Sequence, residues 1–193
     1  MHENELWLSC KAGELRGLEG LYSQFYNPLA NYGGKFTTDD FCIDESIQDL
    51  FRRLWQNRHQ MAYAASVKEL LYGSFRKILL GNLEYNSSRN PHSLSGEHIP
   101  FCLDLPDRHP LIAKSRMTDL YGRWETLLQS LSNRQREAMY LKYYEGIPQE
   151  RVGDIMNMHS GGTHSLLRTA LESLHNSFGN FSLLVLFYLL KQS

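Results

Sequence analysis

The chain has 193 residues, of which 42% are hydrophobic and 21% are charged, as in an ordinary globular protein of one medium or two small domains. Its formal net charge is −1, so it lacks the basic excess of a protein that coats nucleic acid by itself. The three cysteines are far apart, which favours reduced thiols in a cytoplasmic protein over a disulfide framework.

The first half of the chain predicts helices. Apolar residues recur at helical spacing over residues 18–29, again over residues 47–55 and a third time over residues 66–83. No stretch alternates apolar and polar residues for long enough to indicate a strand. We therefore expect an all-α fold.

The first two of these helices are expected to be separated by a loop. Residues 31–40 contain two adjacent glycines, which predict a loop or a helix break. Asp44 and Glu45 follow, and we expect them in the first turn of the second helix, where negative charge is favourable.

Residues 84–110 predict a flexible linker, because their asparagines, serines and prolines break helices and bury little apolar surface. We therefore expect two small helical domains, residues 1–83 and residues 111–193. The few apolar residues of the linker are expected to dock transiently on a partner: Phe101, Leu103 and Leu105.

The longest apolar run, residues 181–190, has ten residues, about half of the ~20 that a membrane-spanning helix needs. We interpret it as a packing helix rather than an anchor. The N-terminus carries no basic-then-apolar signal segment.

Residues 131–174 predict a helix-turn-helix, with short helices, a tight turn near Asn157 and then a longer amphipathic helix. The second helix of such a module can lie in the major groove of DNA. Asn157 tolerates the left-handed conformation that the turn requires. Gly161 and Gly162 each disfavour helix by ~1 kcal/mol relative to alanine, so we expect this reading helix to begin late or to be frayed in the free protein.

The motifs of this module are more specific than its outline. Residues 131–137 read Leu-Ser-Asn-Arg-Gln-Arg-Glu, and residues 143–147 read Tyr-Tyr-Glu-Gly-Ile. These blocks, in this order, resemble the promoter-reading domain of bacterial sigma factors. In the first half, residues 43–55 resemble the acidic helix of that family that ends in Trp, and residues 69–77 are similar to the block that follows. The resemblance covers roughly residues 18–174.

Two small domains and a linker are similar to the extracytoplasmic-function group of the sigma-70 family, and the leucine-rich C-terminus is similar to variants common in Bacteroidetes. The resemblance implies a factor that binds RNA polymerase core and directs promoter-specific transcription initiation. Residues 1–83 would bind the core enzyme and the −10 element, and residues 111–193 would bind the −35 element. It also implies an anti-sigma factor as partner, and no cofactor.

The resemblance assigns the helix over residues 43–55 to the clamp of RNA polymerase. The apolar residues of this helix are expected in the core, so the candidate contacts lie on its polar face. A polar helix face that is only solvated is the alternative interpretation. The candidate residues are Glu45, Gln48, Asp49 and Arg52.

The candidate DNA contacts come from both halves. Cations interleaved with aromatic residues suit single-stranded DNA, because the cations follow phosphates and the rings stack on unpaired bases. A solvated cationic helix with buried rings is the alternative. In the module, arginines of the first helix are expected on backbone phosphate and the reading helix on base edges or phosphates. The residues are Tyr72, Arg76 and Lys77, then Arg134, Arg136, Ser160, Thr163, His164 and Arg168.

The module departs from the family pattern in two short segments and at one further residue. Residues 151–153 read Arg-Val-Gly instead of Glu-Ile-Ala, residues 162–164 read Gly-Thr-His instead of Thr-Val-Lys/Arg, and Thr169 replaces a basic residue. Residues 131–174 carry five basic and five acidic side chains. Because phosphate contacts supply most affinity for DNA, the resemblance implies core binding more firmly than strong reading of the upstream element.

No pattern typical of an enzyme or a metal site is present, since the histidines and cysteines lack metal-ligand spacing and no phosphate-binding glycine loop or nucleophile elbow occurs. Two other functions stay open. One is a stand-alone helix-turn-helix regulator that binds duplex DNA as a dimer. The other is a sigma-like protein-interaction module without strong DNA binding, which the neutral reading helix favours.

Overall fold

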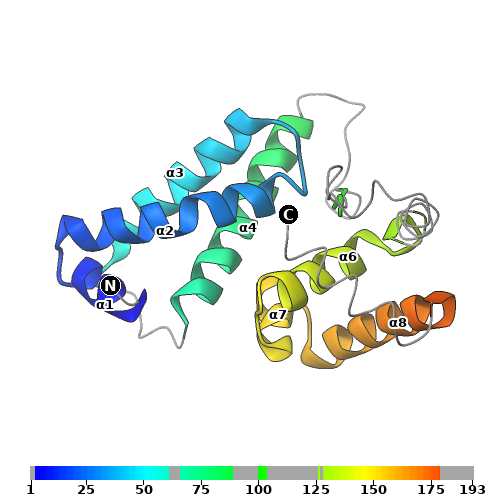
Figure 1. Ribbon diagram of the computed structural model, residues 1–193. Helices are drawn as coiled ribbons and strands as arrows, with labels where there is room; N and C mark the ends of the chain where they lie inside the picture. Colours follow the sequence, from blue (N-terminus) through cyan, green and yellow to red (C-terminus); the bar gives the residue numbers. More distant parts are fainter. Residues whose placement is uncertain (1–2, 61–65, 89–99, 104–125, 127, 179–193) are drawn as a thin grey trace, which may run out of the picture. The chain divides into compact units, whose positions relative to one another are not determined.

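All regular structure in the described residues is helical, so the predicted all-α class is confirmed. The chain divides into two compact units, Met1–Pro100 and Phe101–Ser193. Figure 1 shows the helices of each unit. The computed structural model describes residues 3–60, 66–88, 100–103, 126 and 128–178.

The described part of the N-terminal unit contains α1 (Glu3–Lys11), α2 (Leu15–Gly33), α3 (Asp40–Asn57) and α4 (Val67–Ser88). Helix α1, which the sequence did not indicate, packs on α2, and α3 packs on both α2 and α4. The apolar stripes meet in one core. Its buried residues include Leu21, Phe25 and Leu29 of α2, Ile47, Leu50 and Leu54 of α3, and Leu71, Phe75 and Leu79 of α4.

Helix α3 begins earlier than the sequence indicated. The expectation that Asp44 and Glu45 lie in its first turn is wrong, because the helix starts at Asp40. The Asp39 carboxylate accepts a hydrogen bond from the Cys42 backbone N–H at 3.1 Å and so caps the helix. This cap leaves Glu45 in the body of α3, on its outer surface.

The start of α4 is held by two acceptors. The Ser66 hydroxyl accepts from the Glu69 backbone N–H at 3.3 Å, and the Glu3 carboxylate accepts from the Lys68 N–H at 2.8 Å. A carboxylate is favourable at a helix N-terminus, and this one ties α1 to α4. Helix α4 continues to Ser88, so the first five residues of the expected linker are helical.

The C-terminal unit has the predicted succession of short helices before a longer one. Its described residues form α6 (Asn133–Met139), the π-helical turn η1 (Tyr140–Tyr144), α7 (Gln149–Ile155) and the 19-residue α8 (Ser160–Phe178). Helix α8 packs on α6 and α7 (Figure 1). The buried residues at these contacts include Ala138, Leu141, Val152, Ile155, Leu167, Ala170 and Leu174.

The turn between α7 and α8 has the predicted left-handed residue, since Asn157 has φ 53°. The expectation of a late start for the reading helix is wrong. Helix α8 begins at Ser160, and the Thr163 N–H donates to the His159 carbonyl at 3.1 Å across the two glycines. Packing of the Thr163 side chain against α7 overrides the weak helix propensity of these glycines.

Two apolar residues of the expected linker belong to the C-terminal unit. Phe101 is 1% exposed and Leu103 is 7% exposed, so both are buried in their own chain rather than presented to a partner. Leu105 lies outside the described residues, as does the apolar segment 181–190. The division into residues 1–83, 84–110 and 111–193 stays a prediction. No described helix is long and apolar enough to cross a membrane.

Gly17 marks a close approach between α1 and α2. A Cβ atom on this residue would stand 2.3 Å from the Cys10 nitrogen and 2.7 Å from the Leu6 carbonyl oxygen. Gly17→Ala should therefore lower the free energy of unfolding by about 1–3 kcal/mol, because backbone must shift. The control, Gly81→Ala on α4, meets no atom within 4 Å and should raise that free energy by up to about 1 kcal/mol. Chemical denaturation measures both, and equal effects would contradict this packing.

Candidate nucleic-acid and protein interfaces

The four candidate polymerase contacts share one outer face of α3. Glu45, Gln48 and Arg52 are exposed, and Asp49 is partly exposed. The Asp49 carboxylate pairs with Arg53 at 2.7 Å and with Arg52 at 3.3 Å. Such surface pairs contribute little to stability. These pairs orient the two arginines along α3. A partner that binds the Asp49 carboxylate must compete with both arginines.

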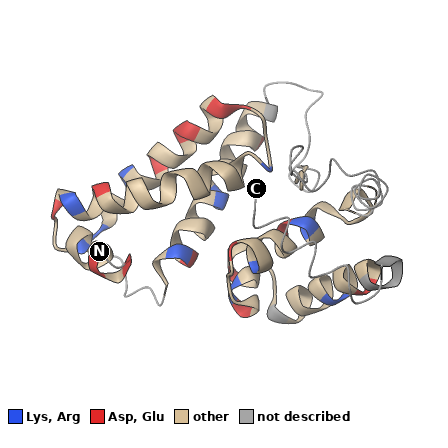
Figure 2. Ribbon diagram, viewed as in Figure 1, with Lys and Arg blue, Asp and Glu red and all other residues tan. Residues whose placement is uncertain are grey.

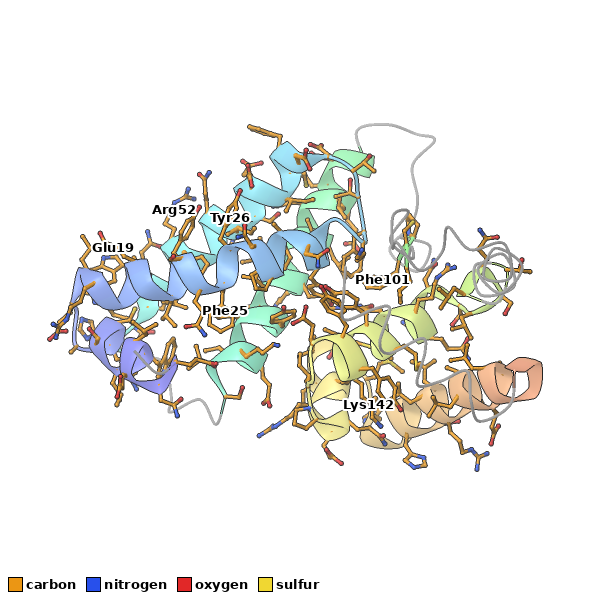
Figure 3. All side chains as sticks on the ribbon, viewed as in Figure 1. Glu19, Phe25, Tyr26, Arg52, Phe101 and Lys142 are labelled. Atoms are coloured by element: carbon orange, nitrogen blue, oxygen red, sulfur yellow. The ribbon has the colours of Figure 1, made fainter. Side chains whose placement is uncertain are left out.

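An aromatic pair on α2 borders this face. The rings of Tyr22 and Tyr26 lie 5.4 Å apart, and the Tyr22 ring meets Phe51 of α3 edge-on at 5.1 Å. The Tyr26 hydroxyl donates to Asp44 at 2.6 Å, and this hydrogen bond raises the pKa of Tyr26. Figure 3 shows Tyr26 on α2 and Arg52 on α3. Exposed tyrosines beside charged groups are typical of protein interfaces.

The apolar spacing over residues 18–29 includes Tyr22 and Tyr26 as well as Leu21 and Phe25, so it predicts that both tyrosines lie in the core. The structure buries Leu21 and Phe25 but leaves Tyr22 37% exposed. The stripe is therefore wider than the core it covers, and its tyrosine edge is surface.

Tyr72 does not fit the prediction of direct DNA contact. Its ring is fully buried, 5.3 Å from the ring of Tyr32, because position 72 lies on the core stripe of α4 together with Phe75. A buried ring offers no face to an unpaired base. The two cations that follow it are more accessible, since Arg76 is partly exposed and Lys77 is exposed.

A groove of about 380 Å³ lies between α3 and α4. Its rim carries Arg53 and Lys77, and none of its described lining residues is acidic. Such a surface favours an anionic ligand with an apolar portion, as a nucleotide base and phosphate are. The other lining residues are Leu50, Leu54, Leu70, Leu71 and Ile78, the polar Asn57, Ser74 and Asn82, and Gly81.

The two arginines of α6 differ in their surroundings. Arg134 is exposed and has no ion-pair partner among the described residues. The Arg136 guanidinium donates to the Leu128 carbonyl at 3.2 Å and to the Asn133 side-chain oxygen at 2.5 Å. The predicted phosphate contact therefore fits Arg134, whereas Arg136 is engaged inside its own unit.

Thr163 is 1% exposed and so does not face a base. It packs against Gly153 of α7, where a Cβ atom would stand 2.6 Å from the Thr163 Oγ1. The two departures from the family pattern therefore belong together, because the missing side chain at Gly153 makes room for Thr163. This contact sets the separation of α7 and α8.

The remaining candidates on α8 are at the surface. His164 and Arg168 are exposed, one turn apart on the helix. Arg168 lies 3.4 Å from Glu172, a solvent-exposed pair that is weak and salt-sensitive. Ser160 opens α8, and its side chain lies outside the described part of the chain.

Thr169, the position that is basic in the resembling family, links two helices. It accepts a hydrogen bond from the Gln135 side-chain nitrogen at 3.1 Å. Gln135 also completes a capping box with Ser132 at the start of α6. The departure at Thr169 therefore exchanges a cation for a contact between α6 and α8.

Most of the lysine and arginine side chains described on η1, α7 and α8 have a partner in their own unit. Lys142 donates to Gln149, and Arg151 pairs with Asp154 at 3.0 Å. Figure 2 shows acidic and basic residues mixed on α7. In the described residues, Arg134 is the arginine of this unit without such a partner. The described helices α6 to α8 therefore offer few unengaged cations to DNA phosphate.

The capped α6, the short α7, the left-handed turn and the long α8 together form a helix-turn-helix with an exposed, histidine-bearing reading helix. Residues 127–176 match the family model for sigma-70, region 4. Helices α6 to α8 lie within this match, except for the last two residues of α8. No curated protein sequence matches the chain.

Two solved structures share the fold. One is CnrH in complex with the cytosolic domain of CnrY, with TM-score 0.58, 14% identity, and coverage of 90% of this chain and 95% of that one. The other is the sigma factor RpoE in complex with the anti-sigma factor NepR from Bartonella quintana, with TM-score 0.56, 17% identity, and coverage of 82% and 94%. The resemblance to sigma-70 factors is confirmed for region 4 by the family model, and the fold is shared with these two structures. A Bacteroidetes origin is not supported by these matches.

Gly153→Ala should separate α7 from α8 and lower the free energy of unfolding by about 1–3 kcal/mol, because the new methyl group meets Thr163 Oγ1. Adding Thr163→Ala should recover part of this loss, since the Thr163 Cβ would lie at an ordinary contact distance of 3.6 Å. Thermal denaturation of both variants and of Thr163→Ala measures the coupling. Additive losses would contradict the packing role of Thr163.

Proposed function

We propose that this protein is a sigma factor that binds RNA polymerase core and directs promoter-specific transcription initiation. The observation that carries the proposal is the match of residues 127–176 to sigma-70 region 4. The same chain also has an N-terminal helical unit, and its fold resembles that of the sigma factor RpoE over most of both chains. Recruitment of the polymerase, rather than catalysis by this chain, is the mechanism.

The polymerase would bind the outer face of α3. Glu45, Gln48 and Arg52 are exposed there without a place in the core, so their side chains are available to a partner. The neighbouring Tyr22 and Tyr26 add exposed aromatic area, which supplies much of the binding energy in protein interfaces. Asp49 would exchange its pairing with the arginines of α3 for a cation of the clamp.

Promoter DNA would be bound in two places. In the N-terminal unit, the groove rimmed by Arg53 and Lys77 would hold the unpaired strand of the −10 element, with Arg76 nearby on α4. In the C-terminal unit, α8 would enter the major groove of the −35 element with His164 and Arg168, while Arg134 binds backbone phosphate.

An anti-sigma factor is the partner that the similar structures suggest. RpoE was solved with the anti-sigma factor NepR, and CnrH with the cytosolic domain of CnrY. We infer that a protein of this class binds the present chain and covers its polymerase face. The protein would act in the cytoplasm, where the polymerase is.

One observation favours a second function, a sigma-like module that binds protein partners without strong DNA binding. Arg136, Arg151 and Arg168 are engaged within the C-terminal unit, and its reading helix offers His164 where the family tends to carry a cation. Transcription separates the two functions. Purified polymerase core with this chain should initiate at defined positions on a pool of randomised upstream sequences. Binding to core without such initiation would establish the second function instead.

Gln48→Ala should weaken binding to polymerase core several-fold, because the amide lies at the centre of the α3 face. The change should move stability by about half a kcal/mol or less, since the side chain is exposed. Gln24→Ala is the matched control, an exposed glutamine of α2 that points about 200° away from Tyr22 and Tyr26. Core affinity is measured by fluorescence anisotropy with helical content checked by circular dichroism. Equal affinity of the two variants would exclude the α3 face.

DNA binding by the full chain should be weak and should depend only shallowly on salt. Arg134→Ala should reduce the slope of log affinity against log salt by ~0.9, the value for one phosphate. Arg151→Ala is the control, because this exposed arginine is already paired with Asp154, and its slope should change less. His164→Lys should tighten binding by adding a cation on α8. Fluorescence anisotropy with duplex DNA over a series of salt concentrations measures these affinities and slopes. A steep slope with nanomolar affinity in the unmodified chain would instead indicate an autonomous regulator.

A further inference from the structure

A short described segment, residues 100–103, places Phe101 and Leu103 in the C-terminal unit. Phe101 and Leu103 are buried, whereas Cys102 between them is exposed. Burial of every second residue is the pattern of an extended segment with one side against a surface. The segment therefore binds along the unit as a short strap, although it lies more than twenty residues before α6 in the sequence.

Ring packing and a shared acceptor hold this strap. The Phe101 ring meets the Tyr140 ring edge-on at 5.8 Å, and the Phe101 backbone N–H donates to the Asn133 Oδ1 at 3.3 Å. The same oxygen accepts from Arg136 Nη2, while Arg136 Nη1 donates to the Leu128 carbonyl at 3.2 Å. One amide oxygen has two lone pairs, and this geometry uses both. Burial raises the pKa of the Tyr140 hydroxyl, so the ring beside Phe101 stays neutral.

Arg136 acts here through its shape. Its planar fork reaches two acceptors on different segments, Asn133 on α6 and Leu128 before it, and thereby fixes the oxygen to which the strap binds. A lysine keeps the positive charge but cannot reproduce the fork. Replacement by lysine therefore distinguishes a positioning role for Arg136 from a phosphate contact, which would tolerate the change.

We propose that residues 100–103 are an anchor that sets the length of the tether between the two units. With the anchor in place, the connection from Ser88 to Pro100 spans at most about 40 Å. With the anchor released, the connection would run from Ser88 to residue 111, where the predicted C-terminal domain begins, and could span up to about 75 Å. If the two units contact promoter DNA together, as proposed above, the anchor controls the effective concentration of the second contact and the range of spacings it tolerates.

The length effect has a definite size. Effective concentration falls roughly as the −3/2 power of tether length once the tether exceeds the span. Release of the anchor lengthens the connection from about 12 to about 23 residues, which corresponds to a roughly threefold fall. A 12-residue insertion before the anchor corresponds to a roughly threefold fall. An insertion of the same length after the anchor does not lengthen the chain between Ser88 and Pro100 and should have no such effect.

The anchor itself is tested on the free protein through its own thiol. Cys102 is exposed, whereas Cys10 and Cys42 are buried, so a nitroxide label is directed to the strap. Its paramagnetic resonance spectrum should show restricted motion in the unmodified chain and in Phe101→Leu. It should show rapid motion in Phe101→Ala and in Arg136→Lys. Helical content should be unchanged, because Phe101 lies outside the helices and lysine is about as good a helix former as arginine in α6. Rapid motion in the unmodified chain, or restricted motion in all variants, would overturn the proposal.

The consequence for promoters is tested in the complex with polymerase core. A 12-residue Gly-Ser insert is placed either between residues 95 and 96 or between residues 106 and 107. The first insert should weaken promoter affinity about threefold and broaden the tolerated spacing between the two elements, while the second should leave both unchanged. In a Phe101→Ala background the two inserts should act alike, and each should weaken promoter affinity roughly twofold, because the released tether is already longer. Equal effects of the two inserts in the unmodified chain would overturn the proposal.

Failure of the proposed function is distinguishable from failure of the anchor. If the unmodified chain directs no promoter-specific initiation at any spacing, the sigma-factor function fails, and the resonance spectra of the label on Cys102 still decide whether the strap is anchored. If initiation occurs and the inserts before and after the strap act alike, the function stands and the anchor fails.

Discussion

Close approach of helices at buried glycines is the constraint on which both units depend. Helices as short as α1 and α7 are marginal in isolation, so they persist only through tertiary contact. A Cβ atom at Gly33 would stand 3.0 Å from the Phe75 ring, and those at Gly17 and Gly153 would meet atoms of the neighbouring helix more closely still. The contacts at these glycines fix the rotation of each helix about its axis. They thereby decide which side chains reach the surface.

The fixed rotation of α8 explains why its reading surface is sparse. Thr163 is turned into the contact with Gly153, and Thr169 is turned toward Gln135, so two positions that could face DNA serve the packing of the unit instead. His164 remains exposed on this helix. The unit is held firmly by polar contacts of its own, and those contacts reduce the number of groups available to phosphate.

Periodicity predicted the helices well because apolar spacing reports directly on burial. It predicted which face of α3 is polar, and Asn157 fixed the turn because few residues tolerate its conformation. It failed where a residue type has two uses. Tyr72 reads equally well as a stacking ring or a core ring, and Arg136 as a phosphate contact or an internal clamp. Only the neighbours from distant segments, Tyr32 for the first and Leu128 for the second, decide between them.

A weakly cationic reading helix is compatible with recruitment by a larger complex for a quantitative reason. A short flexible tether presents a second site at a millimolar effective concentration. A module with a dissociation constant near 1 mM would then be bound about half the time once the first site is occupied, whereas the same module free at about 1 μM would be bound roughly 0.1% of the time. The exposed Arg134, His164 and Arg168 are the groups proposed to make this second contact. Selection for affinity in the separate units is therefore unnecessary, and what has to be controlled is the length of chain between them.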